Sequence, residues 1–334
     1  MKVLVTGAAG FIALHVVERL LARGDDVVGI DNLIPYYDVS LKEARLARLT
    51  GRQGFRFLRQ DLSDREGMAA LFARERFERV VHLGAQPGVR HSLEAPFDYV
   101  DSNLTGHLTV LEGCRRTGVG HLVYASSSSV YGLNRTPFRA ADRTDHPVSL
   151  YGATKKANEA MTHAYAHLFG LPATGLRFFT VYGPWGRPDM ATMKFTRAIL
   201  AGEPIEVYGH GEMKRDFTYV GDIADSIVAL LDRIPEPDPS WTPEAGDQAG
   251  SSAPHRVFNI GNGEPVLLMD FIRTLERLLG KTAVLVLRDL QPGDLLETRS
   301  DTEPLARLLG VAPYTPLAEG LGRFIAWYRE FYRV

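Results

Sequence analysis

Residues 2–13 read KVLVTGAAGFIA, a β-rich apolar stretch that runs directly into a glycine-containing turn. Beyond the turn, apolar side chains recur at helical spacing until Gly24: Ile12, Val16, Val17 and Leu20. Glycines such as Gly7 and Gly10 at a strand-to-helix turn let the main chain approach a pyrophosphate at the helix N-terminus. The stretch therefore predicts the first strand and helix of an α/β domain that binds a dinucleotide.

The next predicted strand, residues 26–30 (DVVGI), supports this interpretation because it ends at Asp31. An acidic residue at that distance from the glycines can bind the ribose hydroxyls of the dinucleotide. A carboxylate there would repel a 2′-phosphate, so we expect NAD rather than NADP. Ala13 replaces the third glycine of the usual pattern, and we expect its methyl group to fit the packing of helix on strand.

The alternation of strands and helices continues along the first half of the chain. Residues 54–58 predict a third strand that leads to Asp61, and residues 79–83 predict a fourth that contains His82. We expect His82 to be a hydrogen-bonded core histidine rather than a base. Asn103 is expected to begin a helix that ends near Gly118. Strands that alternate with helices predict a parallel, doubly wound sheet.

A serine run and a Tyr-Lys pair follow the fifth predicted strand. The strand, residues 121–124, leads into Ser126 to Ser129, at the edge where open α/β sheets bind ligands. Tyr151 and Lys155 are four residues apart on a predicted helix, so their side chains share one face. A nearby cation favours phenolate, whereas an unperturbed tyrosine, with a pKa of about 10, is a poor base. The spacing alone fits an ordinary surface helix equally well.

Composition limits the remaining possibilities. The 334 residues are 45% apolar, which suggests about two domains, and the net charge of −2 without a basic block gives no reason to expect nucleic acid. No apolar run approaches the roughly 20 residues needed to span a bilayer. The first strand begins at residue 2, which leaves no room for a signal peptide. Cys114 is the only cysteine and is expected to pack in the core, so we expect a cytoplasmic protein without a disulfide or bound metal.

These motifs resemble, in their order, the extended short-chain dehydrogenase/reductase family, over nearly the whole chain. The resemblance implies a Rossmann domain (1–178 plus about 222–260) and a smaller C-terminal α/β substrate domain (about 179–221 plus 261–334). It implies that Tyr151 is the catalytic base and that Lys155 binds the nicotinamide ribose and lowers the tyrosine pKa. Ser127, with Ser128 beside it, would hydrogen-bond the reacting oxygen. The cofactor-binding residues implied are Gly7, Gly10, Phe11, Ile12, Asp31, Asn32, Asp61, Leu62, Leu83, Ala85, Asn103, Tyr151, Lys155 and Phe178.

The second half continues the pattern of strands and helices and contains an arginine that suits a diphosphate. A sixth strand (173–179) runs into a Gly- and Pro-rich loop (180–190), and an amphipathic helix begins at Met193. Arg215 can pair with a diphosphate, because a guanidinium matches phosphate oxygens bidentately. A surface salt bridge is the alternative for any single arginine.

Taken together, these segments resemble the sugar-nucleotide epimerase branch, in which residues 193–195, Val207 and Arg215 cradle uridine diphosphate. Residues 149–159, 179–190 and 213–219 are most similar to UDP-glucuronic acid 4-epimerases, and Thr180 and Gln291 both differ from the UDP-galactose enzymes. The substrate-binding residues implied are Gln86, Ser127, Ser128, Ser129, Thr180, Arg187, Met193, Lys194, Val207, Arg215 and Asp294.

The reaction expected from this resemblance is a transient oxidation at C4 of the sugar. Tyr151 takes the hydroxyl proton while hydride passes to NAD⁺, and the same hydride returns to the other face of the 4-keto sugar. NAD would stay tightly bound and be regenerated at each turnover. A 4-keto uronic acid can lose CO₂, and we expect Arg187 and Thr180 to hold its carboxylate out of the alignment that permits this.

Five other functions remain as alternatives. Related dehydratases carry an Asp-Glu pair, and decarboxylases a glutamate, in the serine segment, whereas residues 127–129 contain no acid. A UDP-glucose epimerase would act on a neutral sugar instead of a uronic acid. A net oxidoreductase would release the reduced cofactor, whereas an epimerase retains NAD. Non-catalytic NAD sensors commonly lose the tyrosine or the lysine, and this chain has both.

Two further expectations concern the surface. The helices at about 102–117 and 150–169 resemble the pair that forms a homodimer interface in this family, with core packing as the alternative. Residues 235–255 contain five prolines and predict an exposed loop without a catalytic role, with disorder left open.

Overall fold

The structure, a computed structural model, describes residues 1–290, 295–310 and 314–334 and divides into two compact units. The first unit consists of Met1–Asn134, Arg139–Phe178 and Ala224–Asn259. The second consists of Arg135–Phe138, Phe179–Ile223 and Ile260–Val334. The boundary at Ile223 falls within helix α9 (Val220–Leu231), so this helix contributes residues to both.

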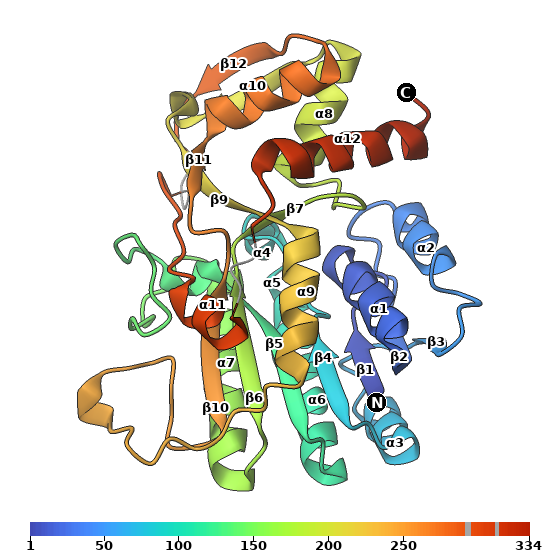
Figure 1. The fold of residues 1–334 in the computed structure, drawn as a ribbon, viewed down its shortest axis with the longest axis vertical. Helices are drawn as coiled ribbons and strands as arrows, with labels where there is room; N and C mark the ends of the chain where they lie inside the picture. The colour runs from blue at the N-terminus through green and yellow to red at the C-terminus, as the bar shows by residue number, and fades with distance from the viewer. Residues whose placement is uncertain (291–294, 311–313) are drawn as a thin grey trace. The chain divides into compact units, whose positions relative to one another are not determined.

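A seven-stranded sheet forms the centre of the first unit, in the order β10-β6-β5-β4-β1-β2-β3 (Figure 1). Its strands are β1 (Lys2–Thr6), β2 (Asp26–Asp31), β3 (Phe55–Arg59), β4 (Arg79–His82), β5 (His121–Ser127), β6 (Ala173–Phe178) and β10 (His255–Ile260). The pairings from β3 through β2, β1, β4 and β5 to β6 are all parallel. The prediction of a parallel, doubly wound sheet is confirmed.

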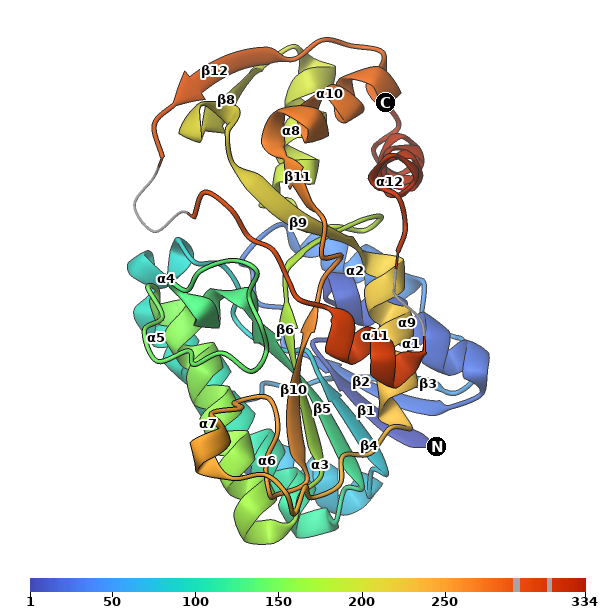
Figure 2. The ribbon, with the colours of Figure 1, turned by 60° about the vertical axis from the view of Figure 1, so that its left-hand side comes forward.

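Helices cover both faces of this sheet. The helices of the first unit include α1 (Phe11–Arg23), α2 (Val39–Ala47), α3 (Arg65–Glu75), α6 (Gly106–Thr117) and α7 (Leu150–Phe169). Figures 1 and 2 show α3, α6 and α7 on one face and α1 with α9 on the other. An ion pair joins Arg19 of α1 to Asp225 of α9, and a second joins Arg23 to Asp232, the residue after α9. Two short helices, α4 (His91–Glu94) and α5 (Pro96–Tyr99), precede α6.

Local sequence signals account for the ends of the helices. The Asp64 carboxylate accepts a hydrogen bond from Gly67 N at the start of α3, and the Ser149 hydroxyl accepts one from Gly152 N at the start of α7. Gly24, Gly118 and Gly170 follow α1, α6 and α7 in the left-handed conformation that glycine adopts without strain. The helix that carries Tyr151 and Lys155 is therefore bounded as the sequence predicts.

The register of the sheet brings several strand ends to one edge. Thr6 at the end of β1 pairs with His82 at the end of β4, and Ser127 at the end of β5 pairs with Phe178 at the end of β6. Ligands of open α/β sheets bind at the carboxyl edge of the strands. The predicted catalytic and cofactor residues lie at or after the ends of these strands and of their neighbours β2 and β3, where Asp31 and Asp61 are found.

Apolar side chains from the sheet and from α3 and α6 form a buried cluster in the first unit, which includes Val80, Leu122, Met68, Leu111 and Cys114. Cys114 is a free cysteine without exposed surface, and burial raises the pKa of its thiol. Its predicted role in core packing is confirmed.

Two segments differ from the sequence prediction. Asn103 lies in a π-helix, Val100–Thr105, that precedes α6, where we had expected an α-helix to begin. The main-chain oxygen of Asn103 accepts a hydrogen bond from Asn158 Nδ2 at 2.6 Å, which satisfies a carbonyl inside this wider turn. Thr180–Tyr182 forms strand β7 rather than a loop, because its main chain pairs in parallel with β9 (Lys214–Tyr219).

The second unit holds two small sheets. β9 lies between β7 and β11 (Pro265–Leu267), and β8 (Pro204–Tyr208) pairs in parallel with β12 (Val284–Arg288). Its helices include α8 (Ala191–Ala201), α10 (Leu268–Leu279), α11 (Glu303–Leu309) and α12 (Leu317–Tyr332). Phe217 of β9 stacks on Phe271 of α10 with ring centroids 4.3 Å apart, so the three-stranded sheet and α10 share one core.

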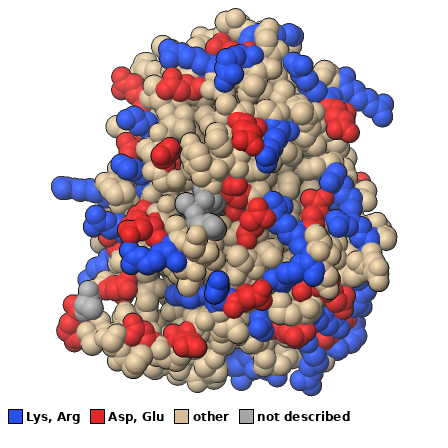
Figure 3. All heavy atoms as spheres, viewed as in Figure 1, with Lys and Arg blue, Asp and Glu red and all other residues tan. Residues whose placement is uncertain are grey.

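The surface carries both signs of charge. Figure 3 shows basic and acidic side chains interspersed over the face seen in Figure 1. In the described part of the chain, no helix combines the length and the apolar character needed to span a bilayer.

The loop between α9 and β10 is exposed over most of its length, as expected. It contains a 3-10 turn, Pro243–Ala245, and the Trp241 indole donates to Asp247 O at 3.0 Å. Ser251 is buried, and its hydroxyl lies 2.8 Å from His163 Nε2 of α7. This end of the loop is therefore attached to the first unit.

Candidate active site

The turn between β1 and α1 approaches the segment after β4 so closely that only glycine fits. Gly7 has a φ of +69°, and a Cβ atom there would lie 2.8 Å from Gly84 Cα. Gly10 is the N-cap of α1, and a Cβ on Gly10 would lie 2.7 Å from Gly7 O. The turn is thus a main-chain cradle at the start of a helix.

The first turn of α1 suits an anion. No side chain caps Gly10 and no acidic residue lies in the first turn, so the helix presents its amide groups and positive dipole end unopposed. Phe11 is buried and Ile12 is half-buried beside this end, and Ala13 is 1% exposed, so its methyl group is accommodated by the core. These features fit the pyrophosphate of the expected dinucleotide.

Asp31 and Asp61 form an acidic rim beside the glycine turn. The Asp31 carboxylate accepts from Ala9 N at 3.2 Å and from Leu33 N at 2.8 Å. Asn32 Nδ2 donates to Asp61 at 2.8 Å. Burial opposes ionisation of Asp61, but hydrogen bonds from Asn32 and Ser63 outweigh it and hold its pKa below the usual value. Two fixed carboxylates suit ribose and adenine donors and disfavour a 2′-phosphate.

Asn103 anchors the segment that follows β4. Its Oδ1 accepts from Gln86 N at 2.8 Å, and its Nδ2 donates to Gln86 O and to Thr154 Oγ1, each at 3.1 Å. Leu83 and Ala85 lie on this segment and are half-buried, and Leu62 is half-buried after β3. The side-chain Nε2 of Gln86 is buried without a hydrogen-bond partner among the described residues, which makes it a donor available to a ligand.

Tyr151 and Lys155 lie one turn apart on α7, on the face toward the sheet edge. Lys155 Nζ donates to Ala125 O of β5 at 3.0 Å, and its side chain is 4% exposed. Burial lowers the pKa of Lys155 to about 8. The ring of Tyr151 meets the edge of the Tyr99 ring with centroids 6.1 Å apart, and Tyr99 donates to Pro87 O. The tyrosine ring is therefore braced from the β4 segment.

The serine hydroxyls lie at the end of β5, where a 3-10 helix (Ser128–Tyr131) begins. Ser127 Oγ accepts from Ser129 N at 3.2 Å and caps this helix. Ser127 is 7% exposed, and Ser128 and Ser129 are half-buried. Phe178, the register partner of Ser127, ends the neighbouring strand and is half-buried.

His82 is a core histidine, as predicted. Its Nδ1 lies 2.8 Å from Thr6 Oγ1, and the side chain is 4% exposed. Burial, with a further contribution from the charge of Lys155, lowers the pKa of His82 to about 3. The ring is neutral at physiological pH and does not act there as an acid.

The predicted substrate residues of the second unit lie on four different elements. Arg187 Nε and Nη2 donate to the Asp189 carboxylate at 3.0 and 2.6 Å. Burial opposes ionisation of Asp189, but the bonds and charge of Arg187 hold its pKa below the usual value. Thr180 is half-buried on β7, and Met193 and Lys194 lie on α8.

Burial separates the remaining members of this set. Met193 is buried and Lys194 is exposed on α8, while Val207 of β8 is fully buried, so its side chain is not accessible to a ligand. Arg215 of β9 donates to Lys214 O at 3.0 Å and reaches Met213 Sδ at 3.2 Å. Asp294 and Gln291 lie outside the described residues.

Sequence reasoning missed three residues that brace the site. Arg45 is fully buried and donates to Ala9 O in the glycine turn at 3.1 Å. Tyr99 supports the Tyr151 ring, and Asn158 bonds to the π-helix at Asn103 O. Asn158 follows Lys155 by three residues, so helical spacing could have indicated it; Arg45 and Tyr99 carry no local signal. Across residues 1–290, 295–310 and 314–334, no group of three or more His, Cys, Asp or Glu side chains is arranged to hold a metal ion.

Comparison with known proteins adds to this geometry. Residues 3–246 match the NAD dependent epimerase/dehydratase family. A protein from Rhizobium meliloti (strain 1021), named a probable UDP-glucuronate 4-epimerase, is 47% identical and covers 100% of this chain and 98% of its own length.

Two solved structures extend the comparison. The UDP-glucuronic acid 4-epimerase from Bacillus cereus, in complex with UDP-glucuronic acid and NAD, is 33% identical with a TM-score of 0.86 over 99% of this chain and 100% of its own. The UDP-glucose 4-epimerase of Thermotoga maritima, with UDP-glucose, is 30% identical with a TM-score of 0.85 over the same shares of the two chains.

Proposed function

Because the chain belongs to the NAD dependent epimerase/dehydratase family and is an NAD-dependent epimerase, we propose that it interconverts UDP-glucuronic acid and UDP-galacturonic acid by inverting C4. The observation that carries this proposal is the chemistry at the end of β5. Tyr151 and Lys155 accompany a segment, Ser127 to Ser129, that offers three hydroxyls and no carboxylate. An epimerase needs one base that returns its proton, whereas a dehydratase also needs an acid.

The chain's own residues divide the work at C4. NAD, when bound, supplies the hydride acceptor and then the donor. Tyr151 accepts the proton of the C4 hydroxyl and later returns it, and the positive charge of Lys155 favours the phenolate form that does this. The Ser127 hydroxyl donates to the reacting oxygen and fixes its position. The sugar turns over between the two steps, and net redox is zero.

Residue placement supports a division of binding between the units. In the first unit, the glycine turn, the Asp31 and Asp61 rim and Asn103 would hold NAD tightly enough to survive purification. Gln86 Nε2, a buried donor without a partner among the described residues, would bond a sugar oxygen. In the second unit, Lys194, Arg215 and the main chain at Val207 would bind the uridine diphosphate.

The uronate carboxylate would be held by Thr180 and Arg187. A guanidinium that binds a carboxylate at two points fixes its orientation and so prevents loss of CO₂ from the 4-keto sugar. Asp189 engages Nε and Nη2 of Arg187, so a substrate carboxylate would compete with Asp189 for this guanidinium.

The test is incubation of purified protein with UDP-glucuronic acid and no added cofactor, followed by chromatography of the sugar nucleotides. We expect UDP-galacturonic acid without CO₂, which requires that NAD is retained and that Thr180 and Arg187 hold the uronate carboxylate. A UDP-pentose product would contradict the assignment and identify a decarboxylase. Stoichiometric release of NADH would identify a net oxidoreductase.

A neutral-sugar 4-epimerase is the second candidate, and one observation favours it. Arg187 already has a carboxylate partner in Asp189, which a neutral hexose would leave undisturbed. Turnover of UDP-glucose with no turnover of UDP-glucuronic acid would establish this alternative.

We further propose that the protein is a homodimer through α6 and α7. Leu108 of α6 is 41% exposed, and Leu168 and Phe169 of α7 are 68% and 50% exposed, which leaves apolar surface on both helices. Light scattering after size exclusion would give twice the chain mass for the wild type. A Leu108→Glu variant should elute as a monomer, and a monomeric wild type would contradict the proposal.

A further inference from the structure

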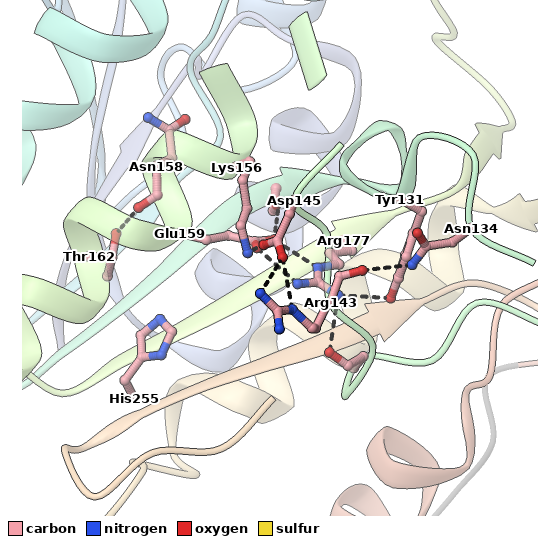
Figure 4. A network of polar contacts seen from close by, with 12 residues as sticks. Tyr131, Asn134, Arg143, Asp145, Lys156, Asn158, Glu159, Thr162, Arg177 and His255 are labelled. Atoms are coloured by element: carbon pink, nitrogen blue, oxygen red, sulfur yellow. Dashed lines mark hydrogen bonds and ion pairs between the residues drawn. The ribbon is translucent and has the colours of Figure 1, made fainter. Parts of the chain in front are cut away.

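A buried ion pair in the first unit lies one helical turn from the proposed catalytic residue Lys155. Glu159 follows Lys155 by one helical turn on α7, and Arg177 lies on β6 (Figure 4). Arg177 Nε and Nη2 donate to the two Glu159 oxygens at 2.8 and 2.9 Å. The side chains are 1% and 5% exposed, so the pair is removed from water.

The chain on either side of Ser127 to Ser129 is bonded to this one pair. At the near end, Ser126 Oγ donates to Glu159 Oε1 at 2.6 Å. At the far end, Arg177 Nη1 donates to the Tyr131 hydroxyl at 3.0 Å, and that hydroxyl donates to Asn259 Oδ1 of β10 at 2.5 Å. Arg177 Nη1 also donates to Ala140 O at 3.1 Å. The pair therefore joins β5, β6, the 3-10 helix and α7 through charged hydrogen bonds.

Stability alone does not account for this arrangement. Two buried charges lose their hydration, and replacing a buried pair with apolar side chains is often neutral or stabilising. Burial opposes the charge of Glu159, yet the charge and bonds of Arg177 hold the pKa of this carboxyl below its usual value. Lys156, the other cation near Glu159, is 4.0 Å away. The carboxylate thus stays ionised and able to accept from Ser126.

The bond to Ser126 bears on catalysis because of strand geometry. Successive side chains of a strand point to opposite faces, so a fixed Ser126 also fixes the direction of Ser127. We propose that the Glu159–Arg177 pair, hereafter the clamp, sets the position of Ser127 relative to Tyr151 and Lys155, which makes Glu159 a positioning residue. A misplacement of about 1 Å at a reacting group can cost on the order of 10²-fold in rate. This inference rests on the proposed function only for the identity of the reaction.

The first test removes a single bond of the clamp. Ser126→Ala leaves the ion pair intact. Thr174→Val is its control, because Thr174 is also buried on this sheet but has a different partner: its hydroxyl lies 2.9 Å from His121 Nε2. We expect Ser126→Ala to lower kcat about 30-fold with KM within about twofold of the wild type. Thr174→Val should leave both constants within about twofold. Equal kcat in the two variants would overturn the proposal.

The second test separates positioning from folding. Glu159→Leu combined with Arg177→Met removes both charges and fills the space with apolar groups, so the fold is expected to persist. Glu159→Gln combined with Arg177→Met also removes the charges but keeps an oxygen that can accept from Ser126. The clamp predicts a loss of kcat of about 30-fold for the Leu variant and a smaller loss for the Gln variant, which can keep the bond to Ser126 but lacks the bond from Arg177 to Tyr131. Full activity in the Leu variant would show that the pair is structural only.

A readout without substrate keeps the two proposals apart. Hydrogen exchange of peptides covering residues 126–131 should be at least about tenfold faster in Ser126→Ala than in Thr174→Val, with matched unfolding temperatures. If the wild type does not turn over UDP-glucuronic acid, the proposed function fails, and kcat is then measured with the sugar nucleotide that the wild type does convert. Unchanged exchange in Ser126→Ala would contradict the clamp whatever the substrate.

Discussion

The two units hold their predicted site residues in different ways. In the first unit, Lys155 donates to a main-chain carbonyl of β5, and Asn103 bonds both main-chain groups of Gln86. In the second unit, Arg187 donates to the Asp189 carboxylate and Lys194 is exposed, while Arg215 donates to the main-chain oxygen of its own neighbour, Lys214. Main-chain anchors are part of the fold, whereas side-chain partners can be exchanged.

From this difference we expect the proton-transfer step to depend on the first unit and the choice of substrate to depend on the second. A base must be held in position before the substrate arrives, because its rate contribution depends on alignment. Charged side chains with replaceable partners suit a ligand that enters and leaves at every catalytic cycle. We therefore expect changes in the first unit to act on kcat and changes in the second unit to act on KM and on the product formed.

The largest effect should come from Tyr151→Phe, which removes the proposed base and leaves the ring against Tyr99. We expect kcat to fall about 10³-fold, within the range for loss of general base catalysis, while NAD content and binding of UDP-glucuronic acid stay unchanged. Steady-state kinetics and absorbance of the released NAD would measure this. Tyr165→Phe is the control, since it makes the same substitution on α7 at a hydroxyl that donates to Glu112. A loss below about tenfold would assign the base to another group.

The next effect should come from Arg187→Lys, which keeps the charge and removes bidentate binding. We expect kcat/KM for the uronate to fall about 30-fold, as for a lost hydrogen bond to a charged group, and UDP-pentose with CO₂ to appear. Chromatography of the products resolves both changes. Arg197→Lys, at an exposed position on the same unit, should change neither. Epimerisation by the Arg187 variant without UDP-pentose or CO₂ would show that Arg187 does not hold the uronate carboxylate.

A smaller effect should follow from pH. Burial lowers the pKa of Lys155 to about 8, so the amine is mainly charged at pH 7 and mainly neutral at pH 9. Loss of that charge disfavours the phenolate, and we expect kcat/KM to fall about tenfold for each pH unit above 8. Initial rates from pH 6 to 9.5 would show this limb. Rates that rise throughout this range would indicate that deprotonation of the tyrosine, and not charge on the lysine, limits turnover.

The sequence predicted the parts of the site that depend on local pattern. The glycine turn and the helix that carries Tyr151 and Lys155 depend on short local patterns, and each forms where the pattern predicts it. Strand β5 continues to Ser127, three residues beyond the predicted end at Tyr124. The π-helix at Asn103 and the strand at Thr180 were missed, because each depends on partners far along the chain: Asn158 for the first and β9 for the second. Arg187 pairs with Asp189, only two residues away. The sequence does not distinguish an arginine that pairs with its neighbour from one that binds a ligand.

The smallest effect should come from Arg215→Lys in the second unit, at the proposed diphosphate contact. Lysine keeps one charge but cannot match two phosphate oxygens, so we expect the Kd of UDP to rise about fivefold with kcat unchanged. Calorimetric titration with UDP measures this directly. Arg273→Lys is the control, since Arg273 bonds Asp270 on the exposed side of α10. If Arg215→Lys lowered kcat instead of weakening binding, Arg215 would take part in alignment at C4, and the expectation that residues of the second unit act on binding would fail.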